Sequence, residues 1–155
     1  MSGVDYKEIL KLQKQIQALR ESDKTAFLTA TAKEAAARLW QKVRNDTQAG
    51  VYPAESGKTG GTLKRGWVVR GLEVQKMGDS TIVSIRIINP VHYASYVEYG
   101  HRQTPGRFVP AIGKRLKKGW VEGQFILRKA EMELEDQLPG IIERKLQKLF
   151  NETFQ

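Results

Sequence analysis

The sequence predicts an α+β protein in which helices at both ends of the chain flank a small antiparallel sheet. Apolar residues recur every three or four positions between residues 5 and 48 and again after residue 121, as in amphipathic helices. Between residues 67 and 88 many of them alternate with polar residues, as in strands. A chain of 155 residues with 40% apolar composition can bury one core, so we expect residues 1–155 to form a single domain.

Two helices are expected in the N-terminal third. The first, from Asp5 to Arg20, has a narrow apolar seam typical of a helix that docks on another helix, formed by Ile9, Leu12, Ile16 and Leu19. Residues 1–20 are therefore a candidate protruding interaction helix and subunit interface. The second helix should run from Lys24 to Gln48, capped by Ser22 or Asp23. Its expected inward side chains are Leu28, Ala32, Ala35, Leu39 and Val43, flanked by Phe27, Ala36 and Trp40.

The stretch ESGKTGGTLK at residues 55–64 contains GKT, a fragment of the phosphate-binding P-loop motif. That motif needs a glycine five positions before Gly57, where this chain has Tyr52, and Pro53 removes a backbone N–H. A P-loop also follows a strand, whereas this stretch follows a predicted helix. We therefore expect a flexible polar loop from Val51 to Lys64, with a turn at Gly60-Gly61, and no nucleotide site.

A β-hairpin is expected next. Its strands run from Trp67 to Lys76, with a bulge at Gly71, and from Thr81 to Ile88. The turn between them is Met77-Gly78-Asp79-Ser80. In the second strand the side chains on one face are Val83, Ile85 and Ile87.

Asn89-Pro90 should then start a short helix that ends at Gly100, with Tyr93, Tyr96 and Val97 on one face. A long basic loop follows, because residues 99–121 contain six basic side chains and no acidic one: Arg102, Arg107, Lys114, Arg115, Lys117 and Lys118. Such a stretch favours contact either with phosphates or with an acidic protein surface.

The last predicted element is a long amphipathic helix from Val121 to Phe150, kinked at Pro139. Its expected apolar stripe consists of Phe125, Ile126, Ala130, Leu134, Leu138, Ile142, Leu146 and Leu149. The neighbouring carboxylates, Glu131, Glu133, Glu135 and Asp136, read as the solvated side of this helix.

Residues with catalytic or metal-binding chemistry are sparse. The chain has no cysteine, and its two histidines, His92 and His101, are too far apart in sequence to share one helix face. We expect His92 at a helix start and His101 in an exposed loop. No serine lies in a nucleophile elbow. The sequence therefore predicts no enzyme, no metal site and no cofactor, and it has no apolar run that could cross a membrane or direct secretion.

The order of the segments resembles a known family. TGGTLKRGW leads into two strands, NPVHYASYVEYGHR follows them, and FVP, GWVEGQFILRKA and ELEDQLPGIIERKLQKLF close the chain. Together these segments resemble the neck or tail-completion family of tailed bacteriophages, a group related to the minor tail protein Z of lambda-type phages. The most specific motif residues, which the resemblance marks as packing positions, are Tyr93, Ala94, Val97, Glu98, Gly100 and Phe125.

The resemblance implies a structural protein without catalysis or cofactor, assembled in the bacterial cytoplasm and located in the virion neck. It implies a homo-oligomeric ring, six-fold to match the tail, whose partners are the adaptor or connector, the tail terminator and the tail tube. DNA would cross the channel and could touch the basic loop transiently. The alternative is a small basic nucleic-acid-binding accessory protein, which the net charge of +9 favours.

Overall fold

The computed structural model describes residues 7, 10, 11, 13, 14, 21–52 and 54–154. Its helical elements are α2 (Glu21–Asp46), η1 (Ala54–Ser56), α3 (Thr62–Gly66), α4 (Ala94–Tyr99), η2 (Pro110–Ile112) and α5 (Ile126–Phe154). Its strands are β1 (Val68–Met77), β2 (Ser80–Ile88), β3 (Gly100–Arg102), β4 (Phe108–Val109), β5 (Lys114–Arg115) and β6 (Trp120–Glu122). These elements confirm the predicted α+β class. The predicted helix from Asp5 to Arg20 lies largely outside the described residues, and all four residues of its apolar seam, Ile9, Leu12, Ile16 and Leu19, do so.

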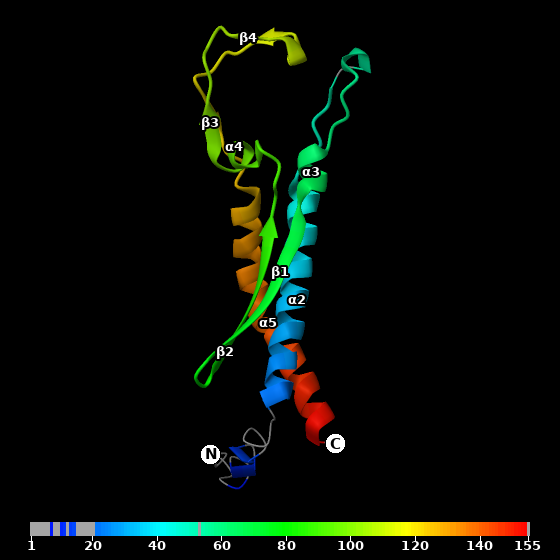
Figure 1. Cartoon of the computed structure of the whole chain (residues 1–155), viewed down its shortest axis with the longest axis vertical. Coiled ribbons are helices and arrows are strands. Elements are labelled where there is room, and N and C mark those ends of the chain that lie inside the picture. The colour runs from blue at the N-terminus through cyan, green and yellow to red at the C-terminus, as the bar shows by residue number, and fades with distance from the viewer. Residues whose placement is uncertain (1–6, 8–9, 12, 15–20, 53, 155) are drawn as a thin grey trace, which may run out of the picture.

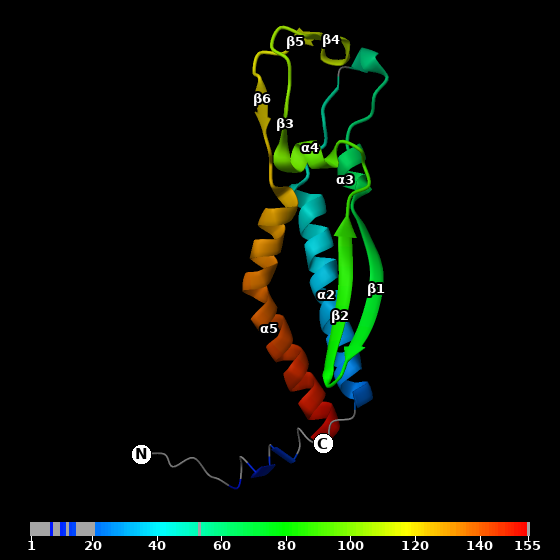
Figure 2. The ribbon, with the colours of Figure 1, turned by 60° about the vertical axis from the view of Figure 1, so that its left-hand side comes forward.

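The molecule is elongated, and its long elements run along the long axis (Figure 1). Helices α2 and α5 lie side by side in opposite directions, and the β1–β2 hairpin packs on α2. Helix α2 therefore lies between the hairpin and α5 (Figure 2). Strands β3 to β6 extend from one end of this body as an arm, which is residues 100–122.

Helix α2 confirms the predicted inward face. Val43 and Ala36 are buried, and the other predicted inward residues are partly buried. The predicted cap is wrong, because Ser22 and Asp23 lie inside the helix rather than before it. The periodic apolar pattern did not identify Thr31 and Thr47 as buried residues. Their hydroxyls can be buried because each donates a hydrogen bond to a backbone carbonyl one turn earlier.

The core lies at the end of the body near the arm. Val43, Trp67, Ile126 and Ala130 form its buried centre, and side chains from α2, β2, α4 and α5 pack around them. The two indole groups are satisfied: Trp67 Nε1 donates to Thr47 Oγ1 at 2.8 Å, and Trp40 Nε1 donates to the Trp67 carbonyl at 2.8 Å. These bonds fix the start of β1 against the last turns of α2.

The β1–β2 hairpin matches the prediction closely. Met77 pairs with Ser80 across a two-residue turn that contains Gly78, and the register shifts between Arg70 and Glu73, around Gly71. Both glycines have positive φ, which suits a tight hairpin turn and a bulge. The β2 side chains on the predicted inward face, Val83, Ile85 and Ile87, are partly buried, and Ile87 reaches the core.

Two short segments differ from the prediction. Part of the expected loop is helix α3, which follows Gly61 in the left-handed region. The predicted start of a helix at Asn89-Pro90 is wrong, because α4 begins only at Ala94. Asn89 instead bridges segments: its Oδ1 accepts from the Val91 N–H at 3.2 Å, and its Nδ2 donates to the Leu63 carbonyl of α3 at 2.8 Å.

Helix α5 begins at Ile126, not at Val121, because residues 120–122 pair with β3 as strand β6. The helix continues through Pro139. In the second half of its apolar stripe the prediction misplaced two residues, Ile142 and Leu146, which are both exposed. Ile141 is 1% exposed and faces inward, whereas Ile142 is 38% exposed at the edge of the stripe.

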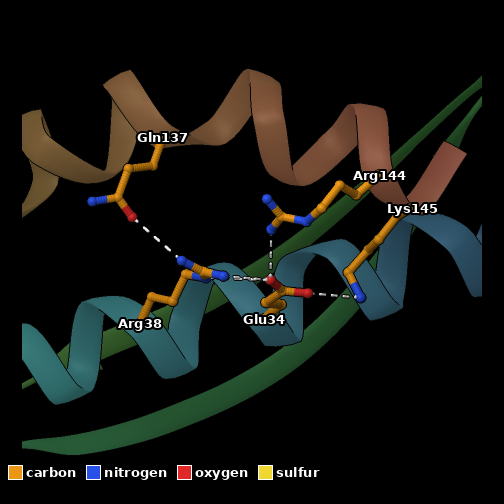
Figure 3. Close-up of polar contacts among 5 residues, drawn as sticks. All are labelled: Glu34, Arg38, Gln137, Arg144 and Lys145. Atoms are coloured by element: carbon orange, nitrogen blue, oxygen red, sulfur yellow. Dashed lines mark hydrogen bonds and ion pairs between the residues drawn. The ribbon is translucent and has the colours of Figure 1, made fainter. Parts of the chain in front are cut away.

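Charged pairs on the α2–α5 surface complement the antiparallel packing of these helices (Figure 3). Glu34 of α2 binds Lys145 at 2.9 Å and Arg144 at 3.4 Å, both from α5, and also Arg38 of its own helix. The hydrogen bond from Lys145, followed by that from Arg38, holds the pKa of the Glu34 carboxyl below its usual value. Further along, Lys42 binds Glu133 at 2.9 Å, and that bond, followed by the one to Asp46, raises the pKa of Lys42.

Candidate assembly surfaces

The junction between α4 and α5 carries most of the motif residues. Glu98, in the last turn of α4, is only 8% exposed. Its carboxylate oxygens accept hydrogen bonds from the backbone N–H groups of Leu127 at 3.1 Å and Arg128 at 3.2 Å. These donors lie in the first turn of α5, where backbone N–H groups have no partner inside the helix and the helix dipole favours a negative charge. Glu98 therefore caps a helix that is distant in sequence.

Backbone contacts join the same segments. The N–H of Gln124 donates to the Val97 carbonyl at 2.8 Å, and the N–H of Phe125 donates to the Glu98 carbonyl at 3.1 Å. Phe125 has φ +51°, and its carbonyl accepts the first helical bond, from Lys129 at 3.0 Å. Phe125 thus occupies the N-cap position without a side-chain oxygen, which explains why Glu98 supplies one from α4.

Two glycines allow this close approach. A Cβ on Gly123 would overlap the backbone at Glu98 and Tyr99, and a Cβ on Gly100 would lie 2.5 Å from the Val121 carbonyl oxygen. Gly100 also has φ +84°, which favours glycine. Close backbone packing therefore explains the glycines at positions 100 and 123, and it sets the direction in which the arm leaves the body.

The other motif residues support this junction in different ways. Val97 packs against the core, and Ala94 is the first residue of α4. Tyr93 is partly buried and lines a cavity of about 190 Å³ together with Tyr52 and the Gly60-Gly61 turn. Tyr96, which was predicted to share a face with Tyr93 and Val97, is 56% exposed and differs from them, and its ring lies 5.7 Å from that of His101.

The stretch ESGKTGGTLK lies at the same end of the body. It contributes Glu55 and Ser56 to the η1 turn and then runs into α3, so it follows helix α2 and not a strand. This context agrees with the prediction that the stretch does not have the strand–loop–helix setting of a P-loop. At position 52, where the P-loop motif requires a glycine, the chain has Tyr52, whose ring lies close to Gly50.

The prediction that the basic segment is a loop is wrong, because residues 100–122 form an antiparallel arm of paired strands. β3 pairs with β6, and β4 pairs with β5. Between these pairs, the Gln103 N–H donates to the Gly119 carbonyl at 3.0 Å and the Leu116 N–H donates to the Arg107 carbonyl at 2.9 Å. The hydrogen bonds therefore continue along the arm. The sequence did not reveal this because the strands are only two or three residues long and have no alternating pattern.

The six basic residues of the predicted loop are all exposed on this arm: Arg102, Arg107, Lys114, Arg115, Lys117 and Lys118. Arg115 donates to the Gly106 carbonyl at 2.8 Å. None of the six forms an ion pair with an acidic side chain in the part of the chain that the structure describes. The arm also exposes about half of the side chains of Phe108, Ile112 and Trp120. It therefore presents both apolar area and uncompensated positive charge.

The histidines differ in their surroundings. His92 is exposed in the turn before α4. The prediction that His101 lies in an exposed loop is wrong: it is a β3 residue that pairs with Val121, is partly buried and has its ring 5.7 Å from that of Tyr96. Among the described residues, no group of three or more His, Cys, Asp or Glu side chains is placed to hold a metal ion.

Comparison with known proteins identifies the family. The model of the HK97-gp10-like family, described as "Bacteriophage HK97-gp10, putative tail-component", matches residues 10–100, which is more than half of the chain. The chain belongs to this family and is a structural component of a phage tail. No significant match is found among curated proteins or among solved structures. Within the described residues, no helix has the length and apolar character needed to cross a bilayer.

Proposed function

We propose that this protein forms a ring in the phage neck that completes the tail and joins it to the head. In this proposal it is a neck or tail-completion protein of the type related to the minor tail protein Z of lambda-type phages. Its role is structural and not enzymatic. The observation that carries the proposal is the arm, residues 100–122, which projects from the body of a phage tail component and exposes apolar area and basic side chains that form no ion pair within the described residues.

The exposed apolar area supports assembly over a monomeric role. Beyond the three arm residues, β1 exposes about half of Val69, Leu72 and Val74. Strand β1 pairs only with β2 among the described strands, so its other edge is open. Exposed apolar side chains beside an open edge favour contact with other protein surfaces. We propose six copies per ring, as six-fold tail symmetry requires, flanked by the adaptor or connector and by the tail terminator and tail tube.

The basic arm also permits transient contact with DNA that passes through the ring. The alternative function is that of a small nucleic-acid-binding accessory protein, and it would rest on the same contact, since six exposed cations could bind phosphates. The apolar side chains that share the arm with these cations favour a protein surface instead.

Location in the particle tests the proposal. Purified particles that carry the protein with a C-terminal epitope tag should bind gold-labelled antibody at the junction of head and tail. A tag on the tail tube protein provides the matched control, since it should label the tail away from the junction. Label at the distal tail tip, or absence from intact particles while the protein remains on free DNA, would contradict the proposed role.

A further inference from the structure

The arm has a counterpart of opposite charge within the same chain. Residues 130–143 of α5 contain five acidic side chains and no basic one, whereas residues 99–121 contain six basic side chains and no acidic one. Glu133 binds Lys42 of α2. The other four, Glu131, Glu135, Asp136 and Glu143, are exposed and form no ion pair among the described residues.

Three of these carboxylates, Glu135, Asp136 and Glu143, share a face of α5 with exposed apolar side chains, and Glu131 lies at its edge. Ala130 and Ile141 mark the inward side of the helix, since each is 1% exposed. At 100° per residue, positions 132, 139 and 146 lie roughly opposite to that side, with 135, 136, 142 and 143 beside them. Met132, Ile142 and Leu146 are partly exposed there. We call this apolar and acidic surface the outer face of α5.

The arm cannot reach the outer face of its own α5. It leaves the body at Gly100 and returns at Gly123, just before the N-terminus of α5, and it extends away from the direction in which α5 runs (Figure 2). The junction at Glu98 and the two glycines holds this direction. Only the α5 of another molecule can therefore meet the arm.

We infer that the arm of one copy docks on the outer face of α5 of the next copy. The two surfaces complement each other in charge, and each also exposes apolar side chains: Phe108, Ile112 and Trp120 on the arm, and Met132, Ile142 and Leu146 on the helix. Burial of apolar side chains supplies most of the stability of such contacts, while charges set orientation and association rate. Because the two surfaces differ, the contact is head-to-tail, and its repetition generates a closed ring or a filament. The inference rests on the proposed ring and names its subunit contact.

Two charge-reversed variants test this contact. The first carries Arg107→Glu, Lys114→Glu, Lys117→Glu and Lys118→Glu; Arg115 is retained because it holds the arm backbone. The second carries Glu131→Lys, Glu135→Lys, Asp136→Lys and Glu143→Lys. In each variant the arm and the outer face have the same sign, so each alone should lose the oligomer mass of the wild type. Mixed together, they should restore it, because acidic arms then meet basic helices and basic arms meet acidic helices in alternation.

A control variant separates this effect from net charge. Lys33→Glu, Lys58→Glu and Lys64→Glu shift the net charge in the same direction as the first variant, at positions away from the arm, the outer face and β1, and should leave the oligomer intact. Light scattering coupled to size-exclusion chromatography gives the masses, and circular dichroism confirms folding of each variant.

The measured masses distinguish failure of the proposed ring from failure of the arm–helix contact. A wild-type protein that stays monomeric would contradict the proposed ring itself. A wild-type ring that persists in either charge-reversed variant, or fails to return on mixing, would overturn the arm–helix contact and leave the ring. If the first variant keeps the ring but loses salt-sensitive DNA binding, the arm contacts DNA instead, and the inference is wrong.

Discussion

The carboxylate of Glu98 accepts hydrogen bonds from the first turn of α5, with the Leu127 N–H at 3.1 Å, although the two residues are 29 positions apart in the chain. This contact ties α4 to α5 at the point where the arm leaves the body. It also gives a physical reason for an acidic residue at this position of the motif. The same local geometry explains how a short helix can orient an arm of 23 residues, 100–122.

Removal of this cap should destabilise the protein. We expect Glu98→Ala to lower the free energy of unfolding by about 1–3 kcal/mol, because two backbone N–H groups lose their charged acceptor. Glu55→Ala, at an exposed position in η1, should change it by less than about 0.5 kcal/mol. Urea unfolding measures both values. Equal effects of the two substitutions would show that the Glu98 contacts do not stabilise the junction.

The glycine positions allow a paired test with opposite signs. Gly123→Ala should destabilise the protein, since its Cβ would overlap the Glu98 carbonyl, which is backbone and cannot move aside easily. Gly140→Ala should stabilise it by about 0.5–1 kcal/mol, because its Cβ meets no atom within 4 Å and alanine favours helix. Thermal melting of the two variants compares them directly. A higher melting temperature for Gly123→Ala would contradict the close approach.

The buried hydroxyl of Thr47 should contribute more to the free energy of unfolding than its methyl group does. Thr47→Val keeps the shape but leaves Trp67 Nε1 without its acceptor, so we expect a loss of about 1–3 kcal/mol. Thr47→Ser retains the hydroxyl and should cost about 1 kcal/mol, the scale of one buried methyl group. Denaturant unfolding distinguishes these variants. The reverse order would mean that packing, not the hydrogen bond, dominates at this site.

Glu34 should make the stability of the α2–α5 pair depend on pH. Its pKa is lowered in the folded state, chiefly by Lys145, so its contribution is fully present above the pKa of the unfolded chain and is lost as pH falls through the folded pKa. The stability difference between the wild type and Glu34→Gln should therefore be constant near neutrality and shrink below about pH 4.5. Urea unfolding between pH 3 and pH 7 provides the measurement. A difference that does not vary with pH would show that the carboxylate charge is irrelevant.

The sequence predicted elements whose signal is local. The 3.6-residue period identified Val43 and Ala36, and glycines at 71 and 78 identified the bulge and turn of the hairpin. Features that depend on distant partners were missed. Strands β4 and β5 are stable only as a pair, and the five residues before Ile126 are not helical because residues 120–122 pair with β3.

At the α4–α5 junction and in the arm, the sequence likewise did not predict features that depend on distant partners. The motif marked Glu98 as a packing residue, but its hydrogen bonds to Leu127 and Arg128 depend on the folded positions of α4 and α5. The charge of the arm was visible in the sequence, whereas its extended form and its direction away from α5 were not. The inward position of Ile141 in place of Ile142 depends on how α5 rotates against α2, which periodicity alone does not determine.

The proposed role of this tail component is to join tails to heads. Electron microscopy of lysates from a phage or prophage in which this gene is interrupted tests this role, with the intact gene supplied on a plasmid as the control. We expect filled heads and finished tails that remain separate without the gene, and joined particles when it is restored. Joined particles in normal yield without the gene would contradict the proposed role.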